Sequence, residues 1–177
     1  MKVLAGSLRG RVFKQPATNL VRPLSEKVRA AIFDIVGDPT NLTVLDAYAG
    51  SGAAGFEAAS RGAILVDAIE ANARVAKNIA ENAKLLGLDW GYMLHQMTVE
   101  TWLASPAQQP PVPRYNLIIA DPPYAKLDSD VLDRLGEYLL RDGVLALSHS
   151  SRLSTPSLKL NLVKTKIYGD TALSFYR

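Results

Sequence analysis

The sequence predicts a single α/β domain built on a mostly parallel sheet. Short apolar runs alternate with stretches of helical period through the middle of the chain, which is typical of strands separated by helices. Three of the apolar runs end in an acid, at Asp46, Glu70 and Asp121. Residues 159–177 contain two strand-like runs joined by a Gly-Asp turn, which predicts a closing antiparallel hairpin.

The individual elements follow from these patterns in order. Residues 3–14 predict a small β-hairpin, and 22–37 predict a helix that Ser25 can begin and Gly37 can end. The proline-rich stretch 103–114 predicts a surface loop. The remaining strands are expected at 43–46, 63–70, 91–96, 115–121 and 143–149, and the remaining helices at 53–62, 71–87 and 129–140.

Composition limits the class of protein. The chain has 177 residues, of which 48% are hydrophobic, so one folded domain is expected. It has no cysteine, which excludes disulfides and cysteine-based zinc sites, and its two histidines argue against a metal site. No apolar run approaches the roughly 18 residues that span a bilayer. Arginines occupy the N-terminus where a signal peptide needs its apolar centre, so we expect a cytoplasmic protein without membrane contact.

Charge is distributed unevenly along the chain. Residues 1–29 carry seven lysines or arginines against one glutamate, a net charge of +6, whereas the remaining residues carry a net charge of −3. We therefore divide the single domain into a basic N-terminal extension, 1–37, and a core, 38–177. A basic front indicates a polyanionic partner, most commonly nucleic acid. A solvated basic arm is the alternative, and charge alone favours neither.

The stretch DAYAGSGAAG, residues 46–55, places three glycines in the frame G-x-G-x-x-G. A glycine-rich turn from a strand into a helix lets a ligand approach the backbone closely. Glu70 follows 20 residues after Gly50, at the tip of the next strand, where an acid can accept both hydroxyls of an adenosine ribose. NAD and S-adenosylmethionine both contain this ribose.

The residues before the first glycine favour S-adenosylmethionine. An NAD fingerprint usually runs from an apolar strand directly into that glycine, but here Asp46 ends the strand and Ala-Tyr-Ala intervenes. A carboxylate is poorly placed beside a pyrophosphate, because like charges repel. It suits the positive amino-acid end of S-adenosylmethionine. The alternative is that Asp46 only caps the following helix.

The stretch NLIIADPPY, residues 116–124, predicts a pocket for a nucleobase. The two prolines stiffen the turn and leave carbonyls as acceptors, so Asp121 and the Pro122 carbonyl can both bind one exocyclic amine. Tyr124 can stack on a flat heterocycle. The amine can belong to adenine N6, cytosine N4 or guanine N2. A base inside a helix cannot reach such a pocket, so the target is expected to be flipped or unpaired.

These motifs resemble the RsmD-type bacterial 16S ribosomal RNA guanine-N2 methyltransferases over nearly the whole chain. The resemblance rests on LAGSLRGR, RPLSEKVRAAIFDIV, VLDAYAGSGAAGFEAASRGA, DPPY and YGDTALSFYR. It implies a Rossmann-like class I S-adenosylmethionine-dependent methyltransferase fold with a seven-stranded, mostly parallel sheet. The implied residues are Asp46, Tyr48, Gly50, Gly52 and Glu70 for the cofactor, and Asp121, Pro122 and Tyr124 for guanine N2.

The resemblance also implies a partner, either 16S ribosomal RNA or a small-subunit assembly particle, bound by a monomer. The basic N-terminal segment is expected to touch this RNA, with Arg9, Arg11 and Arg22 as phosphate contacts. The chain departs from the family pattern at Thr98, where the family usually has an acid that meets the adenine amine. Thr98 is expected to contact adenine by its hydroxyl or backbone. Leu24 and Ser148 stand where threonine and glutamate are usual.

Other functions stay open at this point. The Asp-Pro-Pro-Tyr motif also occurs in DNA adenine-N6 methyltransferases, although the short basic front offers little material for reading a DNA sequence. A non-catalytic rRNA-binding assembly factor could keep the fold without turnover. An NAD oxidoreductase is the weakest alternative, because it leaves the second motif without a role.

Overall fold

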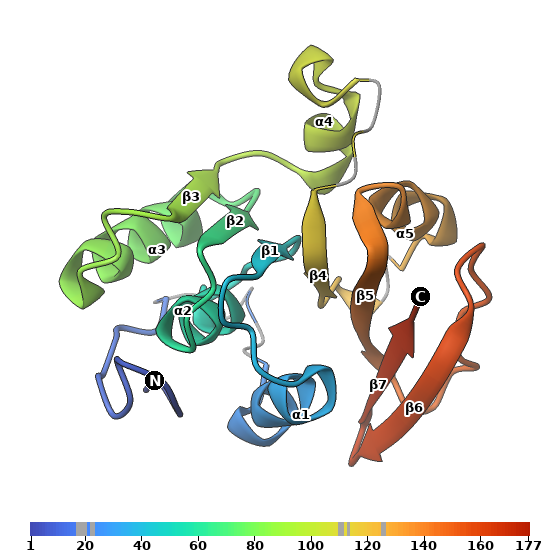
Figure 1. Cartoon of the computed structure of the whole chain (residues 1–177), viewed down its shortest axis with the longest axis horizontal. Coiled ribbons are helices and arrows are strands. Elements are labelled where there is room, and N and C mark those ends of the chain that lie inside the picture. The colour runs from blue at the N-terminus through green and yellow to red at the C-terminus, as the bar shows by residue number, and fades with distance from the viewer. Residues whose placement is uncertain (17–20, 22–23, 110–111, 113, 125–126) are drawn as a thin grey trace.

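The described part of the protein is built on one seven-stranded sheet. The structure is a computed structural model, and it describes the chain except residues 17–20, 22–23, 110–111, 113 and 125–126. The strand order is β3-β2-β1-β4-β5-β7-β6 (Figure 1). The strands from β3 to β5 pair in parallel, and β7 is antiparallel to β5 and to β6. The bounds are β1 Thr43–Asp46, β2 Leu65–Ile69, β3 Tyr92–His95, β4 Tyr115–Ala120, β5 Leu139–Ser150, β6 Leu162–Tyr168 and β7 Thr171–Tyr176. The predicted sheet and its closing hairpin are confirmed.

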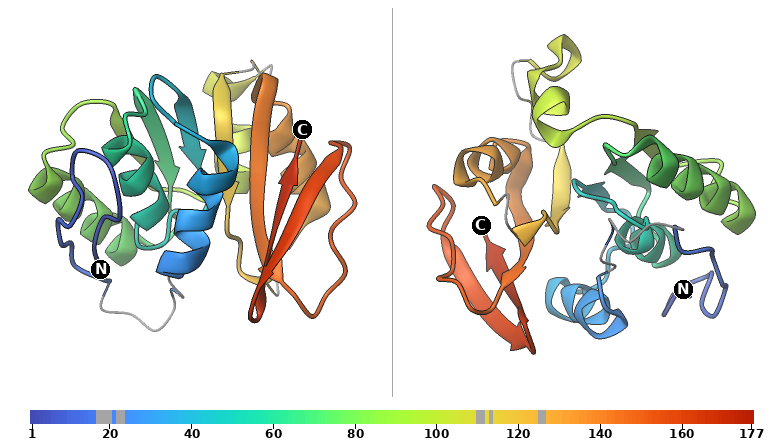
Figure 2. Two further views of the ribbon diagram at one scale, coloured as in Figure 1. Left: turned by 60° about the horizontal axis from the view of Figure 1, so that its bottom comes forward. Right: turned by 180° about the vertical axis from the view of Figure 1, so that it is seen from behind.

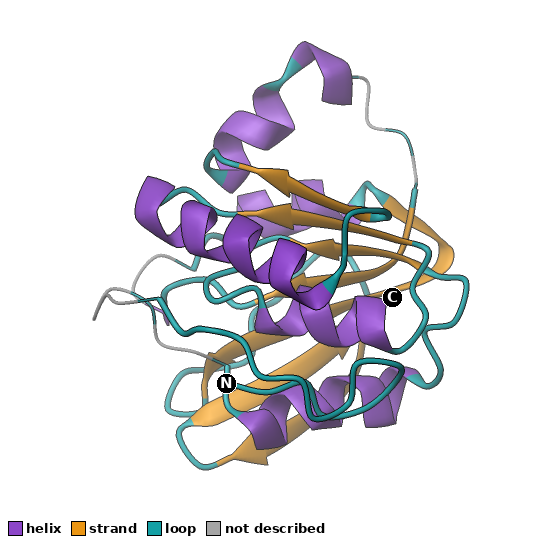
Figure 3. Cartoon of the chain, turned by 90° about the vertical axis from the view of Figure 1, so that its left-hand side faces the viewer, coloured by secondary structure: helices purple, strands orange, loops and turns teal. Residues whose placement is uncertain are grey.

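Helices cover both faces of this sheet, as expected for alternating strands and helices (Figures 2 and 3). The helices are α1 Glu26–Val36, α2 Ala53–Ser60, α3 Ala73–Leu86, α4 Val99–Ala104 and α5 Ser129–Gly136, with a short 3₁₀ helix at Pro106–Gln108. Val44 and Leu117 pack towards α1 and α2, whereas their neighbours Leu45 and Ile118 pack towards α4 and α5. This alternation buries both faces of the central strands.

The helix ends follow the capping residues in the sequence. The Ser25 hydroxyl accepts the Val28 N–H at 3.2 Å, and Gly37 ends α1, as predicted. The helix expected over 129–140 ends instead at Gly136, because Leu139 already pairs with β4 at Tyr115. The predicted loop 103–114 contains the end of α4 and the 3₁₀ helix.

The N-terminal residues fold against the body of the protein. Residues 1–13 form a hairpin with one antiparallel bridge, Lys2–Val12, and Met1 and Phe13 exchange backbone hydrogen bonds. Val3 and Phe13 are 2% exposed and pack in the same cluster as Phe56 of α2. The hairpin therefore contributes apolar side chains to the core.

Candidate active site

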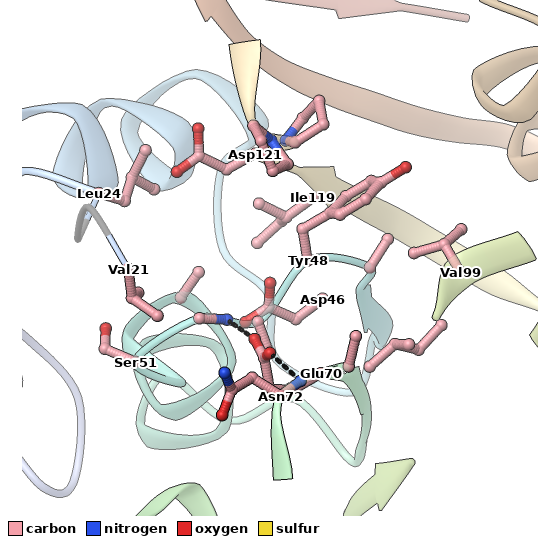
Figure 4. A pocket seen from close by; sticks show the side chains of 18 of the residues that line it. Val21, Leu24, Asp46, Tyr48, Ser51, Glu70, Asn72, Val99, Ile119 and Asp121 are labelled. Atoms are coloured by element: carbon pink, nitrogen blue, oxygen red, sulfur yellow. Dashed lines mark hydrogen bonds between the residues drawn. The ribbon is translucent and has the colours of Figure 1, made fainter. Parts of the chain in front are cut away.

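A cavity of about 500 Å³ opens where β1, β2 and β4 end (Figure 4). The strand order reverses here, since β1 has β2 on one side and β4 on the other. Ligands of open α/β sheets bind at such a switch point, beyond the carboxyl ends of the strands. Eight of the predicted residues line it: Asp46, Tyr48, Gly50, Glu70, Thr98, Asp121, Pro122 and Tyr124.

The glycine loop after β1 adopts positive φ angles, which residues other than glycine adopt only with strain. Gly50 and Gly52 have φ angles of +53° and +77°. Gly50 lines the cavity. Gly52 is not among the lining residues; it begins α2, and an added Cβ would lie 2.9 Å from the Phe56 ring. The structure therefore gives Gly52 a packing reason, and its contact with a cofactor stays a prediction.

Asp46 is a buried acid at the floor of the cavity, only 2% exposed. Its Oδ2 accepts the N–H of Gly55, in the first turn of α2, at 2.9 Å. Burial raises the pKa of Asp46 to about 7; the Gly55 hydrogen bond lowers it, and the charges of Asp121 and Glu70 raise it further. Asp46 thus caps the helix and also lines the cavity, so the two interpretations of this residue are compatible.

Glu70 holds the loop from the neighbouring strand. Its Oε2 accepts the Gly50 N–H at 3.0 Å and its Oε1 accepts the Asn72 N–H at 2.7 Å (Figure 4). Burial raises the pKa of this half-buried carboxyl, against the effect of these hydrogen bonds. An ionised carboxylate offers about four acceptor positions, so Glu70 retains capacity to accept ligand hydroxyls.

The Asp-Pro-Pro-Tyr turn forms the opposite wall. Asp121 is half-buried, Pro122 is buried, and both line the cavity. The Tyr124 hydroxyl lies 3.1 Å from Thr171 Oγ1 and 3.4 Å from Ser148 Oγ. Contacts from β7 and β5 therefore hold the tyrosine at the cavity edge, and Ser148, one departure from the family pattern, takes part in them.

The segment after β3 adds an acid that the sequence analysis missed. Thr98 lines the cavity, and its hydroxyl begins α4 by accepting the Thr101 N–H at 3.1 Å. Glu100 also lines the cavity, two residues beyond Thr98, between the apolar Val99 and the rest of the first helical turn. Only its closeness to Thr98 along the chain could have pointed to it.

The described charged residues that line the cavity are all acidic. Its described lining residues include four acids, Asp46, Glu70, Glu100 and Asp121, and no lysine, arginine or histidine. Such a site attracts a cationic group and repels a pyrophosphate. This argues against a dinucleotide as the ligand.

The predicted phosphate contacts lie elsewhere. The hairpin that carries Arg9 binds Ser60 at the end of α2, and the Arg11 guanidinium donates to the Leu85 carbonyl at 2.9 Å, at the end of α3. Both helices begin near the cavity and run away from it. Arg9 and Arg11 therefore lie at the opposite end of the sheet from the cavity. Arg22 lies outside the described residues.

The histidines have structural partners. His95 Nε2 lies 2.7 Å from Asp67 Oδ1, and His149 Nε2 lies 2.9 Å from Ser174 Oγ. The described part of the chain contains no group of three or more histidines and acids that could hold a metal ion. Nor does that part contain a helix whose length and hydropathy would let it cross a membrane.

Comparison with known proteins places the whole chain in one family. The Escherichia coli protein named ribosomal RNA small subunit methyltransferase D is 25% identical, over 100% of this chain and 89% of its own length. YlbH of Bacillus subtilis, provisionally named an rRNA methyltransferase, is 30% identical, over 100% of this chain and 98% of its own. The structure of the Thermus protein TTHA0928 superposes with a TM-score of 0.82 at 30% identity, over 99% of this chain and 98% of that one.

The family model described as conserved hypothetical protein 95 matches residues 1–177. It covers the glycine loop, the Asp-Pro-Pro-Tyr turn and both chain ends, so the match does not depend on one motif. The resemblance found in the sequence is thereby confirmed, and the chain belongs to this family, whose curated members include methyltransferase D of the small ribosomal subunit.

Proposed function

We propose that this protein transfers a methyl group from S-adenosylmethionine to the exocyclic N2 amine of a guanine in small-subunit 16S ribosomal RNA. One observation carries the proposal. A single acidic cavity brings Asp46 and Glu70, suited to a cationic adenosine ligand, against the Asp121–Tyr124 turn, suited to an amino-bearing base. The names of the relatives support a small-subunit rRNA substrate, and the choice of guanine follows from the family resemblance.

The lining residues fit S-adenosylmethionine. Asp46 would bind the positive amino-acid end, and Glu70 would accept the ribose hydroxyls beside the Gly50 backbone. Tyr48 and Thr98 lie at the cavity as further contacts for the ligand. The four acids of the lining would stabilise the positive sulfonium, which carries the electrophilic methyl that this cofactor supplies when bound.

The base would bind at the Asp-Pro-Pro-Tyr turn. Asp121 and the Pro122 carbonyl would accept hydrogen bonds from the N2 amine and aim its lone pair at the methyl, while Tyr124 stacks on the ring. The methyl group would form a bond to N2 as its bond to sulfur breaks, which leaves S-adenosylhomocysteine, and N2 would then lose a proton to water or to Asp121. Asp121 stabilises the positive charge that develops on nitrogen, so positioning and electrostatics provide most of the rate.

The proposal includes the organisation of the chain. We assign residues 1–37 and 38–177 to one domain that acts as a monomer in the cytoplasm, on free 16S rRNA or on an assembly particle. The packing of Val3 and Phe13 against α2 supports one folding unit. RNA contact by the N-terminal extension stays part of the proposal, although Arg9 and Arg11 could only reach RNA that extends far from the target base.

The test uses small subunits from cells that lack this protein. Labelled S-adenosylmethionine is added, and mass spectrometry locates the methyl group; we expect N2-methylguanine at one nucleotide. Asp121→Ala should lower the transfer rate by about 10²–10³-fold and leave binding of S-adenosylhomocysteine intact, because an acceptor aimed at the developing charge is lost. Asp142→Ala, an exposed acid at the start of β5, is the matched control.

Three outcomes would overturn the proposal in different ways. Absence of transfer together with absence of S-adenosylhomocysteine binding in calorimetry would indicate a non-catalytic factor. Transfer to adenine in duplex DNA, and none to rRNA, would indicate the DNA enzyme. Equal rates for Asp121→Ala and wild type would remove Asp121 from the chemistry.

A further inference from the structure

Strand β6 carries two exposed lysines on one side of the sheet. Lys164 pairs with Phe175 of β7, and Lys166 pairs with Leu173. Directly paired residues of antiparallel strands point to the same face. Phe175 and Leu173 pack in the cluster under α1. The two lysines therefore lie on the α1 side of the sheet, about 6.6 Å apart along an edge strand.

A third lysine, Lys27, connects this pair to the rim of the candidate active site. The Lys27 ammonium of α1 lies 5.6 Å from the centre of the Tyr168 ring, at the end of β6. Tyr168 pairs with Thr171, and Thr171 lines the cavity beside Tyr124. Lys27, Lys166 and Lys164 thus form a basic stripe that begins at the cavity rim and follows β6 away from it.

The cavity itself leaves phosphates without a counter-charge. The described lining residues are acidic or neutral, so a polyanion that delivers a base must be neutralised outside the cavity. Arg152, two residues after the end of β5, has its guanidinium paired with Asp170 at 2.9 Å. Arg9 and Arg11 lie at the far end of the sheet. Among the described residues, Lys27, Lys164 and Lys166 form no ion pair with an acid.

We infer that Lys27, Lys164 and Lys166 bind successive phosphates of the RNA strand that runs from the target base along β6. This inference rests on the proposed function, whose RNA substrate supplies the phosphates. The exposed lysines offer flexible point charges, which bind phosphate without reading sequence. The stripe therefore positions the RNA and leaves the choice of base to the Asp-Pro-Pro-Tyr turn.

Edge protection is the competing role for these lysines. Charged side chains on an edge strand prevent pairing with a second chain. The other face of β6 exposes Val163 and Ile167, 58% and 68% accessible, so its edge has apolar residues to protect. The two roles predict different consequences of removing the charges, because edge protection concerns self-association and phosphate binding concerns salt-dependent RNA affinity.

The test compares two double variants of equal charge change. Lys164→Ala/Lys166→Ala removes the stripe on β6, and Lys77→Ala/Lys84→Ala removes two exposed lysines of α3. Binding to 16S rRNA is measured with S-adenosylhomocysteine present, over a series of salt concentrations. The logarithm of the association constant falls with the logarithm of the salt concentration, and we expect this dependence to be less steep by about 1.5 to 2 in the β6 variant. Its binding to the RNA should also be roughly tenfold weaker than that of wild type. The α3 variant should match wild type.

The outcomes separate the inference from the proposed function. If wild type methylates rRNA and both variants bind and react alike, the stripe does not bind phosphate. If the β6 variant self-associates with unchanged RNA affinity, the lysines only protect the edge, and the inference again fails. If wild type methylates no rRNA, the proposed function fails, and the salt slopes still decide whether the stripe binds RNA. A higher KM with unchanged kcat in the β6 variant would support the inference.

Discussion

Two buried acids hold α2, Asp46 at its first turn and Glu57 in its second, and they have opposite surroundings. Glu57 is 0% exposed and lies 2.8 Å from Arg61 and 3.7 Å from Arg29. Asp46, 2% exposed, accepts the Gly55 N–H and lies in a cavity whose described lining contains no cation. The protein itself therefore compensates the buried charge of Glu57, whereas the charge of Asp46 is left for a ligand to compensate.

The negative charge of Glu57 is compensated by two arginines and two backbone N–H groups. Its oxygens accept the N–H groups of Leu4 and Ala5 at 2.8 and 3.0 Å, which fixes the N-terminal hairpin on α2. Arg29 is also fully buried, and its guanidinium donates to the Lys2 carbonyl at 2.7 Å. Burial lowers the pKa of Arg29, and the charge of Glu57 opposes this. The network joins α1, α2 and the hairpin, and neither Glu57 nor Arg29 is among the residues that line the cavity.

The largest effect should follow from removing the charge of Glu57. Glu57→Gln keeps only one of the two oxygens that accept the Leu4 and Ala5 N–H groups. It also leaves Arg29 buried without its counter-ion, which costs about 3–5 kcal/mol of unfolding free energy. For a chain of this size we expect the midpoint of thermal unfolding to fall by roughly 6–20 °C. Circular dichroism or calorimetry measures it.

Asp46→Asn is the matched control for that experiment, since it makes the same isosteric change in the acid that holds the first turn of α2. It should be neutral or stabilising at pH 8, because it removes a buried charge without a cation. The double variant Arg29→Met/Glu57→Gln should recover part of the lost stability. Equal losses for Glu57→Gln and Asp46→Asn would contradict the distinction between the two acids.

The second effect concerns binding and should appear at Asp46. Asp46→Asn retains an oxygen for the Gly55 N–H and loses the charge that would bind the cationic end of the ligand. We expect affinity for S-adenosylhomocysteine to fall by about 10–100-fold, the equivalent of about 1.5–3 kcal/mol for a hydrogen bond to a charged group. Isothermal calorimetry at pH 8 measures it, with Glu57→Gln tested below its unfolding midpoint. Unchanged affinity would make Asp46 a helix cap alone.

The fold and much of this site could be predicted from the sequence because the responsible signals are local. Ser25 and Gly37 mark the ends of α1, and acids at strand tips meet at one edge because parallel strands end together. Asp46, Glu70 and Asp121 therefore line one cavity, as their positions indicate.

The remaining features depend on packing across the sheet, which local patterns do not encode. Thr171 reaches Tyr124 only because β7 inserts beside β5. The positive charge of residues 1–29 could be counted, but the count does not show that Arg11 docks at the far end of α3. Nor does it show that Glu57 and Arg29 pair inside the protein. The net charge of a segment therefore indicates a kind of partner but not where its side chains lie, and RNA contact by Arg9 and Arg11 stays a prediction.

The last effect is the pH dependence of the stability that Asp46 contributes. The pKa of Asp46 rises from 3.8 to about 7 on folding, so the unfolded chain ionises first as pH increases. The contribution of Asp46 to stability is therefore full below about pH 4, falls between pH 4 and 7, and is constant above. In denaturant unfolding, the free energy of unfolding of wild type should decrease relative to that of Asp46→Asn as the pH rises from 4 to 7.

Ligand binding should change in the opposite direction, because a cation binds the ionised form of Asp46. Affinity for S-adenosylhomocysteine should be about tenfold weaker at pH 6 than at pH 8 in wild type, since one pH unit below the pKa leaves roughly a tenth of the carboxyl ionised. Asp46→Asn should show little of this dependence; any remainder is assigned to Glu70, whose pKa burial also raises. A wild-type affinity that is flat from pH 6 to 8 would mean that Asp46 is not the group that compensates the cation. The cavity would then attract its ligand through the summed field of Glu70, Glu100 and Asp121.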